Sequence, residues 1–267
     1  MWIQTTCRLE LDYVYPTPLI LMLRPRSGAS QWVSAETYDF SEPVEVIEYT
    51  DQYGNLCQRL TAPKGGFVVE TSATVSTPDQ MDTGQGEPFV DIAHLPEEVL
   101  RYLVPSRYCE SDRFGNRAIE VAGPGNSGYD QVAQIVAWIR AQITYAPGTS
   151  GMPCTASEIL ETGEGVCKDL SHLGVAMCRS ISIPARFVVG YLHGLEPMDL
   201  HAWFEAYVGD RWYTFDPTQS DLTGARVAIA YGRDAADVAI YHQFGPPARF
   251  TDMTVSVEIF TPPGRLP

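Results

Sequence analysis

Residues 164–179, EGVCKDLSHLGVAMCR, mark the sharpest change of pattern in the chain. Glycine-rich sequence ends at Cys167, and an apolar repeat begins at once. The apolar positions recur at three- and four-residue intervals, as one face of a helix requires: Leu170, Leu173, Gly174, Met177, Cys178 and Ile181. Cys167 is therefore expected in the first turn of a buried helix. The unpaired N–H groups and the positive end of the helix dipole favour a thiolate at that position.

Cys167 has two interpretations. Taken alone, a cysteine on an apolar helix is most often a small structural hydrophobe, and a reactive cysteine needs a base within reach. Cys178 lies about 16 Å further along the helix at 1.5 Å per residue, so it is assigned to the core. His172 follows Cys167 on a part of the helix that turns away from the sulfur. It is expected at the surface or one layer behind the site.

Residues 199–218, DLHAWFEAYVGDRWYTFDPT, predict a hairpin that carries the base. Two alternating, aromatic-rich runs flank Gly209-Asp210, and glycine at the first central position suits a two-residue type II′ turn. That turn places Trp203 opposite Asp216, and His201 lies on the same side of its strand as Trp203. His201 and Asp216 then become diagonal neighbours, with their Cα atoms about 7–8 Å apart.

The hairpin thus supplies the base and the orienting carboxylate that nucleophilic catalysis by a thiol requires. A slip of one residue in the register would move Asp216 to the opposite face and separate the pair. The alternative interpretation makes His201 a histidine at a strand end and Asp216 a turn residue before Pro217. Both interpretations stay open on spacing alone.

The remaining sequence indicates an α+β chain in two parts. Short alternating runs separated by turn residues predict a small N-terminal antiparallel β-sandwich: CRLELDYVY, PLILMLRPR, VEVIEYT, LCQRLTA and GGFVVETSATVS. The polar residues 77–87 are typical of a linker. Beyond them, LPEEVLRYLV and YDQVAQIVAWIRAQI have helical spacing, while ARFVVGYL and the closing MTVSVEIF alternate as strands. We expect an N-terminal β domain at residues 1–88 and a second domain at 89–267.

Composition narrows the class of protein. The 267-residue chain has a net charge of −15 and a pI near 4.6, which argues against binding nucleic acid or an anionic membrane. The charge favours neutral or cationic substrates, although solubility alone also explains it.

The longest apolar run, LILML, is too short to span a bilayer, and the N-terminus lacks a signal-peptide pattern. A cytoplasmic location with reduced thiols is expected. The six cysteines include no CxxC pair and no metal-ligand spacing, so no metal is predicted.

Several blocks carry a family resemblance. GEGVCKDLSHLGVAMCRSISIPARFVVGYL and HAWFEAYVGDRWYTFDPT resemble the bacterial transglutaminase-like cysteine protease family, which belongs to the transglutaminase-like superfamily. YGRDAADVA resembles the segment that follows the aspartate in bacterial members, and LRPR and DQYGN resemble their accessory β domain. The resemblance implies a papain-like α+β catalytic domain at residues 89–267, with the cysteine on a helix packed against an antiparallel sheet that carries the histidine.

Carried over residue by residue, the resemblance assigns Cys167 as the nucleophile, His201 as the general base and acid, and Asp216 as the orienting carboxylate. It implies a peptide or protein substrate and no cofactor. It leaves three outcomes open, because the two possible reactions use the same residues and the family also includes copies without a functional triad. The chain is a thiol hydrolase of amide (peptide or isopeptide) bonds, a protein-glutamine acyltransferase, or a non-catalytic binding protein. Since all three positions are filled, an inactive copy is the least expected of these.

Three further residues are candidates for the cleft. The reaction needs donors to an oxyanion, and the Cys167 N–H and the Tyr145 hydroxyl are candidates, although Tyr145 also suits a core or loop position. Lys168 adds positive charge near the sulfur or is a solvated helix residue. Trp203 either shields the histidine–aspartate pair from water or is an ordinary sheet aromatic. No EF-hand loop is present, and the sequence predicts no oligomeric state.

Overall fold

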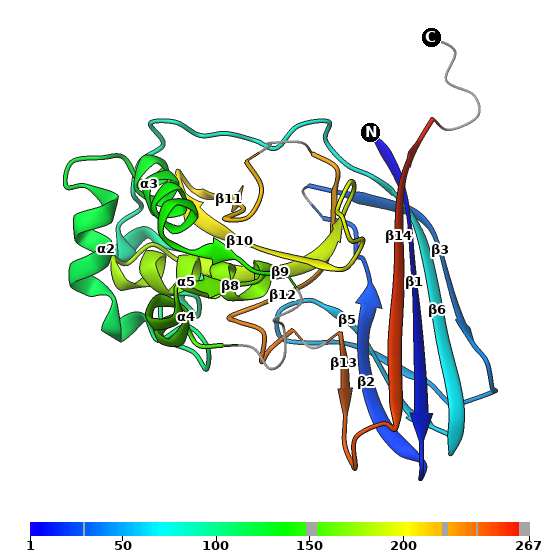
Figure 1. Ribbon diagram of the computed structural model, residues 1–267. Coiled ribbons are helices and arrows are strands. Elements are labelled where there is room, and N and C mark those ends of the chain that lie inside the picture. Colours follow the sequence, from blue (N-terminus) through cyan, green and yellow to red (C-terminus); the bar gives the residue numbers. More distant parts are fainter. Residues whose placement is uncertain (29, 148–153, 221–223, 239, 262–267) are drawn as a thin grey trace.

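The computed structural model describes residues 1–261, apart from residues 29, 148–153, 221–223 and 239. Figure 1 shows two packed parts, a β-sandwich on one side and a group of helices on the other. A further sheet, named here the central sheet, runs from the helices toward the sandwich. The mixed α+β fold predicted from the sequence is confirmed.

The sandwich consists of two antiparallel four-stranded sheets. The first has the order β14-β1-β6-β3, with the bounds Phe250–Phe260, Trp2–Tyr13, Gly65–Ser76 and Trp32–Phe40. The second has the order β13-β2-β5-β4, with the bounds Tyr241–Gln243, Thr17–Arg24, Leu56–Ala62 and Ile47–Thr50. Burial alternates along β1, β2 and β6, as expected for strands with one face on a core. The pattern of residues 32–40 did not predict β3, which is largely exposed.

The last two strands of the chain return to the sandwich. β14 pairs with β1 from Trp2↔Phe260 to Asp12↔Phe250, and β13 pairs with β2. The expected division at residue 88 therefore does not separate the sheets, because residues 241–260 complete both sheets of the N-terminal part. Strand pairing between chain ends leaves no local signal, since an alternating run does not specify its partner.

The central sheet has the order β11-β10-β9-β12 and is antiparallel. Its strands have the bounds Arg211–Phe215, His201–Val208, Ala185–Leu192 and Arg226–Gly232. The helices beside it are α2 to α5, with the bounds Gly115–Ala122, Gly128–Gln142, Ala156–Thr162 and Cys167–Ser180. Shorter elements complete this part: η1 (Ile92–His94), α1 (Glu97–Leu100), η2 (Ser111–Arg113), β7 (Thr144–Tyr145) and β8 (Glu164–Gly165). The helix expected over LPEEVLRYLV is limited to α1, and sequence patterns missed α2, α4 and β12.

The sandwich and the central sheet share buried contacts. Side chains of β9 and β12, including Tyr191 and Val227, belong to the same core cluster as Leu9 and Leu11 of β1. The buried Asn55, in the turn before β5, exchanges two hydrogen bonds of 2.8 Å with the backbone of Tyr231 in β12. The sandwich therefore fixes an edge strand of the central sheet.

Close packing between α5 and β10 depends on a glycine. A Cβ atom added at Gly174 would lie 2.5 Å from Cε1 of Phe204, whose ring is fully buried. We expect Gly174→Ala to destabilise the protein by about 1–3 kcal/mol, because overpacking forces the helix and sheet apart. Urea unfolding measures the change.

Gly115→Ala is the matched control for this prediction. Gly115 begins α2, and a Cβ atom there would meet nothing within 4 Å. Alanine is a better helix former than glycine, so this variant is expected to be as stable as the wild type or slightly more stable. Equal stability of Gly174→Ala and Gly115→Ala would contradict the packing explanation.

Candidate active site

Cys167 is the first residue of α5, as the apolar repeat predicted, and it is half-buried. The buried carboxylate of Asp169 fixes the start of the helix. Its Oδ2 accepts the N–H of Val166 at 3.1 Å, and its Oδ1 accepts the N–H of Cys154 at 3.2 Å. A negative side chain in the first turn also interacts favourably with the helix dipole. Cys178 is fully buried, so its assignment to the core is confirmed.

His201 begins β10, and Asp216 directly follows β11. Nε2 of His201 lies 2.8 Å from Oδ2 of Asp216, and each side chain is only 2 % exposed. Because Nε2 is engaged by the carboxylate, Nδ1 is the ring nitrogen available to the sulfur of Cys167. The structure therefore brings the three residues named from the sequence into one site.

The hairpin has the expected register but a different turn. Val208 pairs with Arg211, and the ladder continues to Phe204↔Phe215, as predicted. Gly209 and Asp210 both have positive φ, at 55° and 62°. Positive φ at both central residues defines a type I′ turn, so the type II′ prediction is wrong. The register survives because both turns have two residues, and aspartate tolerates the left-handed conformation.

Asp216 is held as an anion by several donors. Its Oδ1 accepts the N–H of Thr218 at 2.9 Å, the hydroxyl of Thr218 at 2.8 Å and the N–H of Gln219 at 3.2 Å. Nη2 of Arg226 lies 3.0 Å from Oδ2. Burial alone would raise the pKa of Asp216, but the hydrogen bond and charge of His201, followed by the charge of Arg226, lower it overall.

The surroundings of His201 favour the imidazolium. Burial alone would lower the pKa of His201, but hydrogen bonds to Asp216 and Cys167, with their charges, raise it to about 9. The ring is therefore protonated at neutral pH. A protonated histidine beside a thiol is the arrangement that stabilises a thiolate.

Sequence reasoning missed Arg226. It begins β12, is 8 % exposed, and pairs with Asp216 from the other edge of the central sheet. One signal was present in the sequence, because Arg226 is the single charged residue in GARVAIAY. Charged residues are rarely buried without a partner, so a lone cation in an apolar strand indicates a buried carboxylate nearby.

The three cleft candidates lie near this site. Tyr145 pairs with Gly165 across β7 and β8, and its pKa is raised by burial and then by the charge of Cys167. Lys168 is the second residue of α5 and is half-buried. Trp203 is 2 % exposed, and its ring centre lies 6.1 Å from that of His201 at an interplanar angle of 27°. Their roles in the cleft stay predictions.

His172 is not at the surface. It is fully buried, with its ring stacked on that of Tyr108 at 5.2 Å and tilted against that of Phe187 at 4.9 Å. Its Nε2 accepts the N–H of Ala235 at 3.1 Å, so Nδ1 carries the proton and donates to the carbonyl of Cys154 at 3.2 Å. Burial lowers its pKa to about 4. The neutral ring therefore links α5 to the chain segments before α4 and after β12.

Within the described ranges, no three Cys, His, Asp or Glu side chains gather closely enough to hold a metal ion. Among the same residues, no helix is both long and apolar enough to cross a membrane.

A cysteine at a helix N-terminus beside a histidine–aspartate pair on an adjoining antiparallel sheet is the arrangement that nucleophilic catalysis by a thiol requires. The chain matches the description of the transglutaminase-like superfamily over residues 116–217. The crystal structure of "a Putative Cysteine Protease from Cytophaga hutchinsonii" superposes with a TM-score of 0.84 at 32% identity, covering 98% of this chain and 93% of that one. The chain belongs to the transglutaminase-like superfamily.

Two curated relatives are also similar. An uncharacterized protein of Mycobacterium leprae is 28% identical over 271 residues, covering 92% of this chain and 95% of that protein. The uncharacterized protein YebA of Bacillus subtilis is 24% identical over 160 residues, covering 50% of this chain and 22% of that protein. The superfamily and the Cytophaga structure support a cysteine-dependent hydrolase or acyltransferase.

Proposed function

We propose that the protein is a thiol hydrolase that cleaves an amide bond, in a peptide or an isopeptide, through Cys167, His201 and Asp216. The observation that carries the proposal is the buried 2.8 Å contact between His201 and Asp216, next to a cysteine on a helix N-terminus. A buried carboxylate fixes the ring and stabilises its charged form.

In the first half of the reaction, the Cys167 thiolate attacks the amide carbonyl carbon, and an Sγ–C bond forms. The oxyanion is stabilised by the N–H of Cys167, one of the first-turn groups that have no partner within a helix, and by the Tyr145 hydroxyl. His201 gives its proton to the amide nitrogen as the C–N bond breaks. The amine leaves, and a thioester remains on Cys167.

In the second half, water attacks the thioester carbon and transfers a proton to His201. The C–S bond breaks, the carboxylic acid is released, and the thiolate–imidazolium pair is restored. Asp216 stays ionised throughout, and Trp203 excludes water from one side of the histidine. The reaction needs no cofactor.

Protein-glutamine acyl transfer is the second candidate, because an amine that replaces water at the thioester uses the same three residues. A glutamine peptide with a dansylated primary amine separates the two. Ammonia release without amine incorporation supports hydrolysis, and incorporation that competes with water supports acyl transfer. Cys167→Ala is the blank in both assays.

Alkylation by iodoacetamide tests the proposal without a substrate. Site-resolved mass spectrometry is expected to show Cys167 reacting faster at pH 7 than Cys178, which is buried and has its pKa raised by burial. His201→Ala should remove most of that advantage. If Cys167 reacts no faster than Cys178 in the wild type, the non-catalytic binding protein becomes the better explanation.

Hydrolysis is expected to slow as the pH rises through about 9, the value to which the pKa of His201 is raised. Below that pH the imidazolium can protonate the leaving amine, and above it the proton is lost. Profiles of kcat/KM should show this alkaline limb. Asp216→Asn, which removes the main group that raises the pKa, should move the limb to lower pH. A profile that stays flat well above this pH would contradict the assignment.

Cationic peptides are the proposed substrate class, because the chain carries a net charge of −15. Lysine-rich peptides should therefore be cleaved faster than uncharged peptides of the same length at low salt. The difference should shrink as salt screens the field. Equal cleavage rates for the two kinds of peptide at low salt would contradict this proposal. The net charge would then serve solubility alone.

A further inference from the structure

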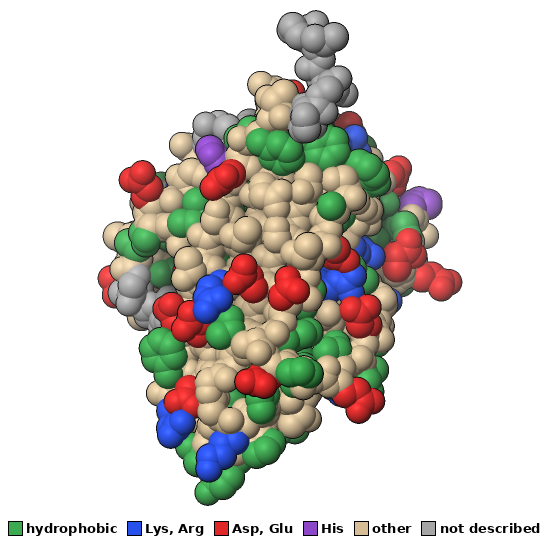
Figure 2. Space-filling model, turned by 90° about the vertical axis from the view of Figure 1, so that its right-hand side faces the viewer, with side chains coloured by type: hydrophobic (Ala, Val, Ile, Leu, Met, Phe, Trp, Pro, Cys, Tyr) green, Lys and Arg blue, Asp and Glu red, His purple; other side chains and the backbone are tan. Residues whose placement is uncertain are grey.

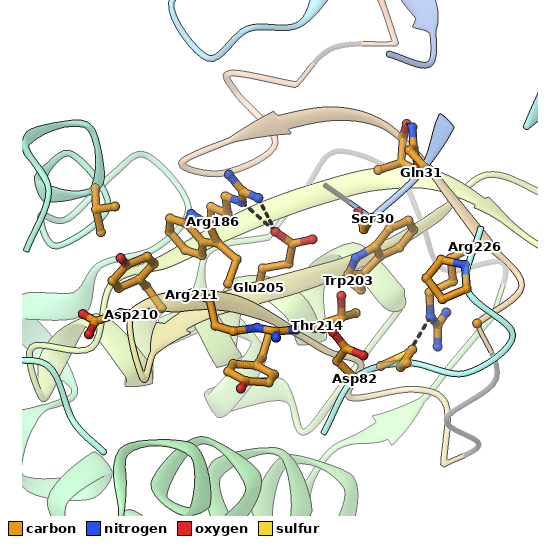
Figure 3. A pocket seen from close by; sticks show the side chains of 18 of the residues that line it. Ser30, Gln31, Asp82, Arg186, Trp203, Glu205, Asp210, Arg211, Thr214 and Arg226 are labelled. Atoms are coloured by element: carbon orange, nitrogen blue, oxygen red, sulfur yellow. Dashed lines mark hydrogen bonds and ion pairs between the residues drawn. The ribbon is translucent and has the colours of Figure 1, made fainter. Parts of the chain in front are cut away.

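A cavity of about 670 Å³ lies on the face of the central sheet opposite α5. Its floor includes Trp203, Glu205 and Thr214, and Figure 3 shows these side chains together on β10 and β11. Because side chains alternate along a strand, this face is opposite Phe204, which packs against α5. The volume is in the range of sites that hold small molecules.

The cavity contains a buried hydrogen-bond donor that has no protein acceptor. Trp203 is 2 % exposed, and among the described residues nothing accepts its indole N–H. A buried N–H without a partner costs free energy, and native structures rarely leave one unmet. The donor therefore indicates an acceptor from outside the protein.

An acceptor lies on the same face of the same strand. Arg186 contacts Glu205 through Nε at 2.7 Å and Nη2 at 2.5 Å, and both contacts fall on Oε2. Figure 3 shows the two dashed lines meeting at one oxygen of Glu205, while the other oxygen points away from Arg186. Trp203 and Glu205 are two positions apart, which is about 7 Å along a strand. The floor of the cavity thus presents one donor and one acceptor side by side.

The charges around the cavity favour a neutral ligand. Its three arginines each contact a carboxylate: Arg186 with Glu205, Arg211 with Asp82, and Arg226 with Asp216. Two more carboxylates, of Glu98 and Asp210, lie exposed at the rim. A ligand carboxylate would meet this excess of negative charge, whereas an uncharged group would not. Apolar and aromatic walls, including Val99 and Trp212, suit an apolar body.

We propose that this cavity binds a small neutral amide with an apolar or aromatic body, distinct from the bond cleaved at Cys167. The amide oxygen accepts the indole N–H of Trp203, and the amide N–H donates to Oε1 of Glu205. An amide meets both groups because it carries one acceptor and one donor side by side. The cavity borders the triad, because Trp203 packs beside His201 and Arg226 pairs with Asp216, but binding there needs no reaction at Cys167.

The test is a titration of the whole protein with N-acetylphenylalaninamide, observed through the indole N–H resonances of the five tryptophans. Trp203→Phe identifies the Trp203 signal. That signal should shift to saturation with a Kd of about 1 mM, as expected for so small a ligand. Trp2, Trp32 and Trp138 lie outside the cavity and serve as internal references.

Three controls decide the result. N-acetylphenylalanine, which has the same body with a carboxylate, should bind at least about 5-fold more weakly. Trp203→Phe should weaken binding of the amide by about 5-fold, followed through the Trp212 signal, and Trp32→Phe should not. No shift of the Trp203 signal at concentrations ten times the expected Kd would overturn the proposal. Equal binding of the carboxylate, or unchanged binding by Trp203→Phe, would also overturn it.

Discussion

Replacing His201 by alanine is expected to lower kcat/KM for amide hydrolysis by about 10³- to 10⁴-fold, because one ring acts as the base and the acid. The variant loses the proton donor for the leaving amine and the charge that stabilises the thiolate. In this mechanism the 2.8 Å contact with Asp216 holds the ring in place and stabilises its charged form. Rates on a peptide cleaved by the wild type measure the effect.

His193→Ala is the matched control for this experiment. His193 lies just beyond β9, is exposed, and contacts the chain through its backbone N–H, which donates to Ala225. Its replacement should leave the rate within about 2-fold of the wild type, since its side chain is exposed and takes no part in the proposed mechanism. If His201→Ala kept more than a tenth of the wild-type activity, the assignment of His201 as the general acid and base would be contradicted. Circular dichroism should first establish that each variant is folded.

Replacing Arg226 by glutamine is expected to destabilise the protein by about 3 kcal/mol, because it removes a buried partner of Asp216. The two side chains are 7% and 2% exposed, so solvent cannot replace the lost charge. The effect depends on pH. The ionised form of Asp216, whose pKa is lowered in the fold, contributes stability above the carboxyl's unfolded pKa. That stability is lost as the pH falls through the folded pKa.

Without Arg226 the pKa of Asp216 should rise, so stability and activity should begin to fall at a higher pH than in the wild type. Urea unfolding at neutral and mildly acidic pH measures the first effect, and the acid limb of kcat/KM measures the second. Arg226→Lys should restore part of the stability and part of the activity at acidic pH, since lysine keeps the positive charge. Arg249→Gln, which removes an exposed ion pair with Asp12, should leave the unfolding midpoint unchanged. An Arg226→Gln protein with wild-type stability at both pH values would contradict a structural role for the pair.

The main parts of the candidate site were readable from local sequence patterns. The helical repeat placed Cys167 at the start of α5, because a helix repeats every 3.6 residues and its ends leave groups unpaired. Alternation placed His201 and Asp216 on one face of the hairpin, and a two-residue turn set the register. The turn type escaped prediction because Gly-Asp is compatible with more than one two-residue turn.

Contacts between distant segments were not readable in this way. The burial of His172 depends on Tyr108, Phe187 and Ala235, which come from three different parts of the chain. The pairing of Arg226 with Asp216 joins opposite edges of one sheet. The cavity behind Trp203 is bounded by α1, by residues 78–82 and by the turn before β3, and only folding brings these segments together.

The sequence by itself determined the helix at Cys167, the hairpin at His201 and the family blocks around them, because backbone pitch and turn length act within about twenty residues. Only the tertiary structure decided that β13 and β14 complete the sandwich, that Arg226 supports Asp216 and that Trp203 faces a cavity. The physical reason is that a local pattern shows that a strand or a buried charge needs a partner. It does not show which segment of the chain supplies that partner. The partner's identity depends on packing and burial across the whole chain.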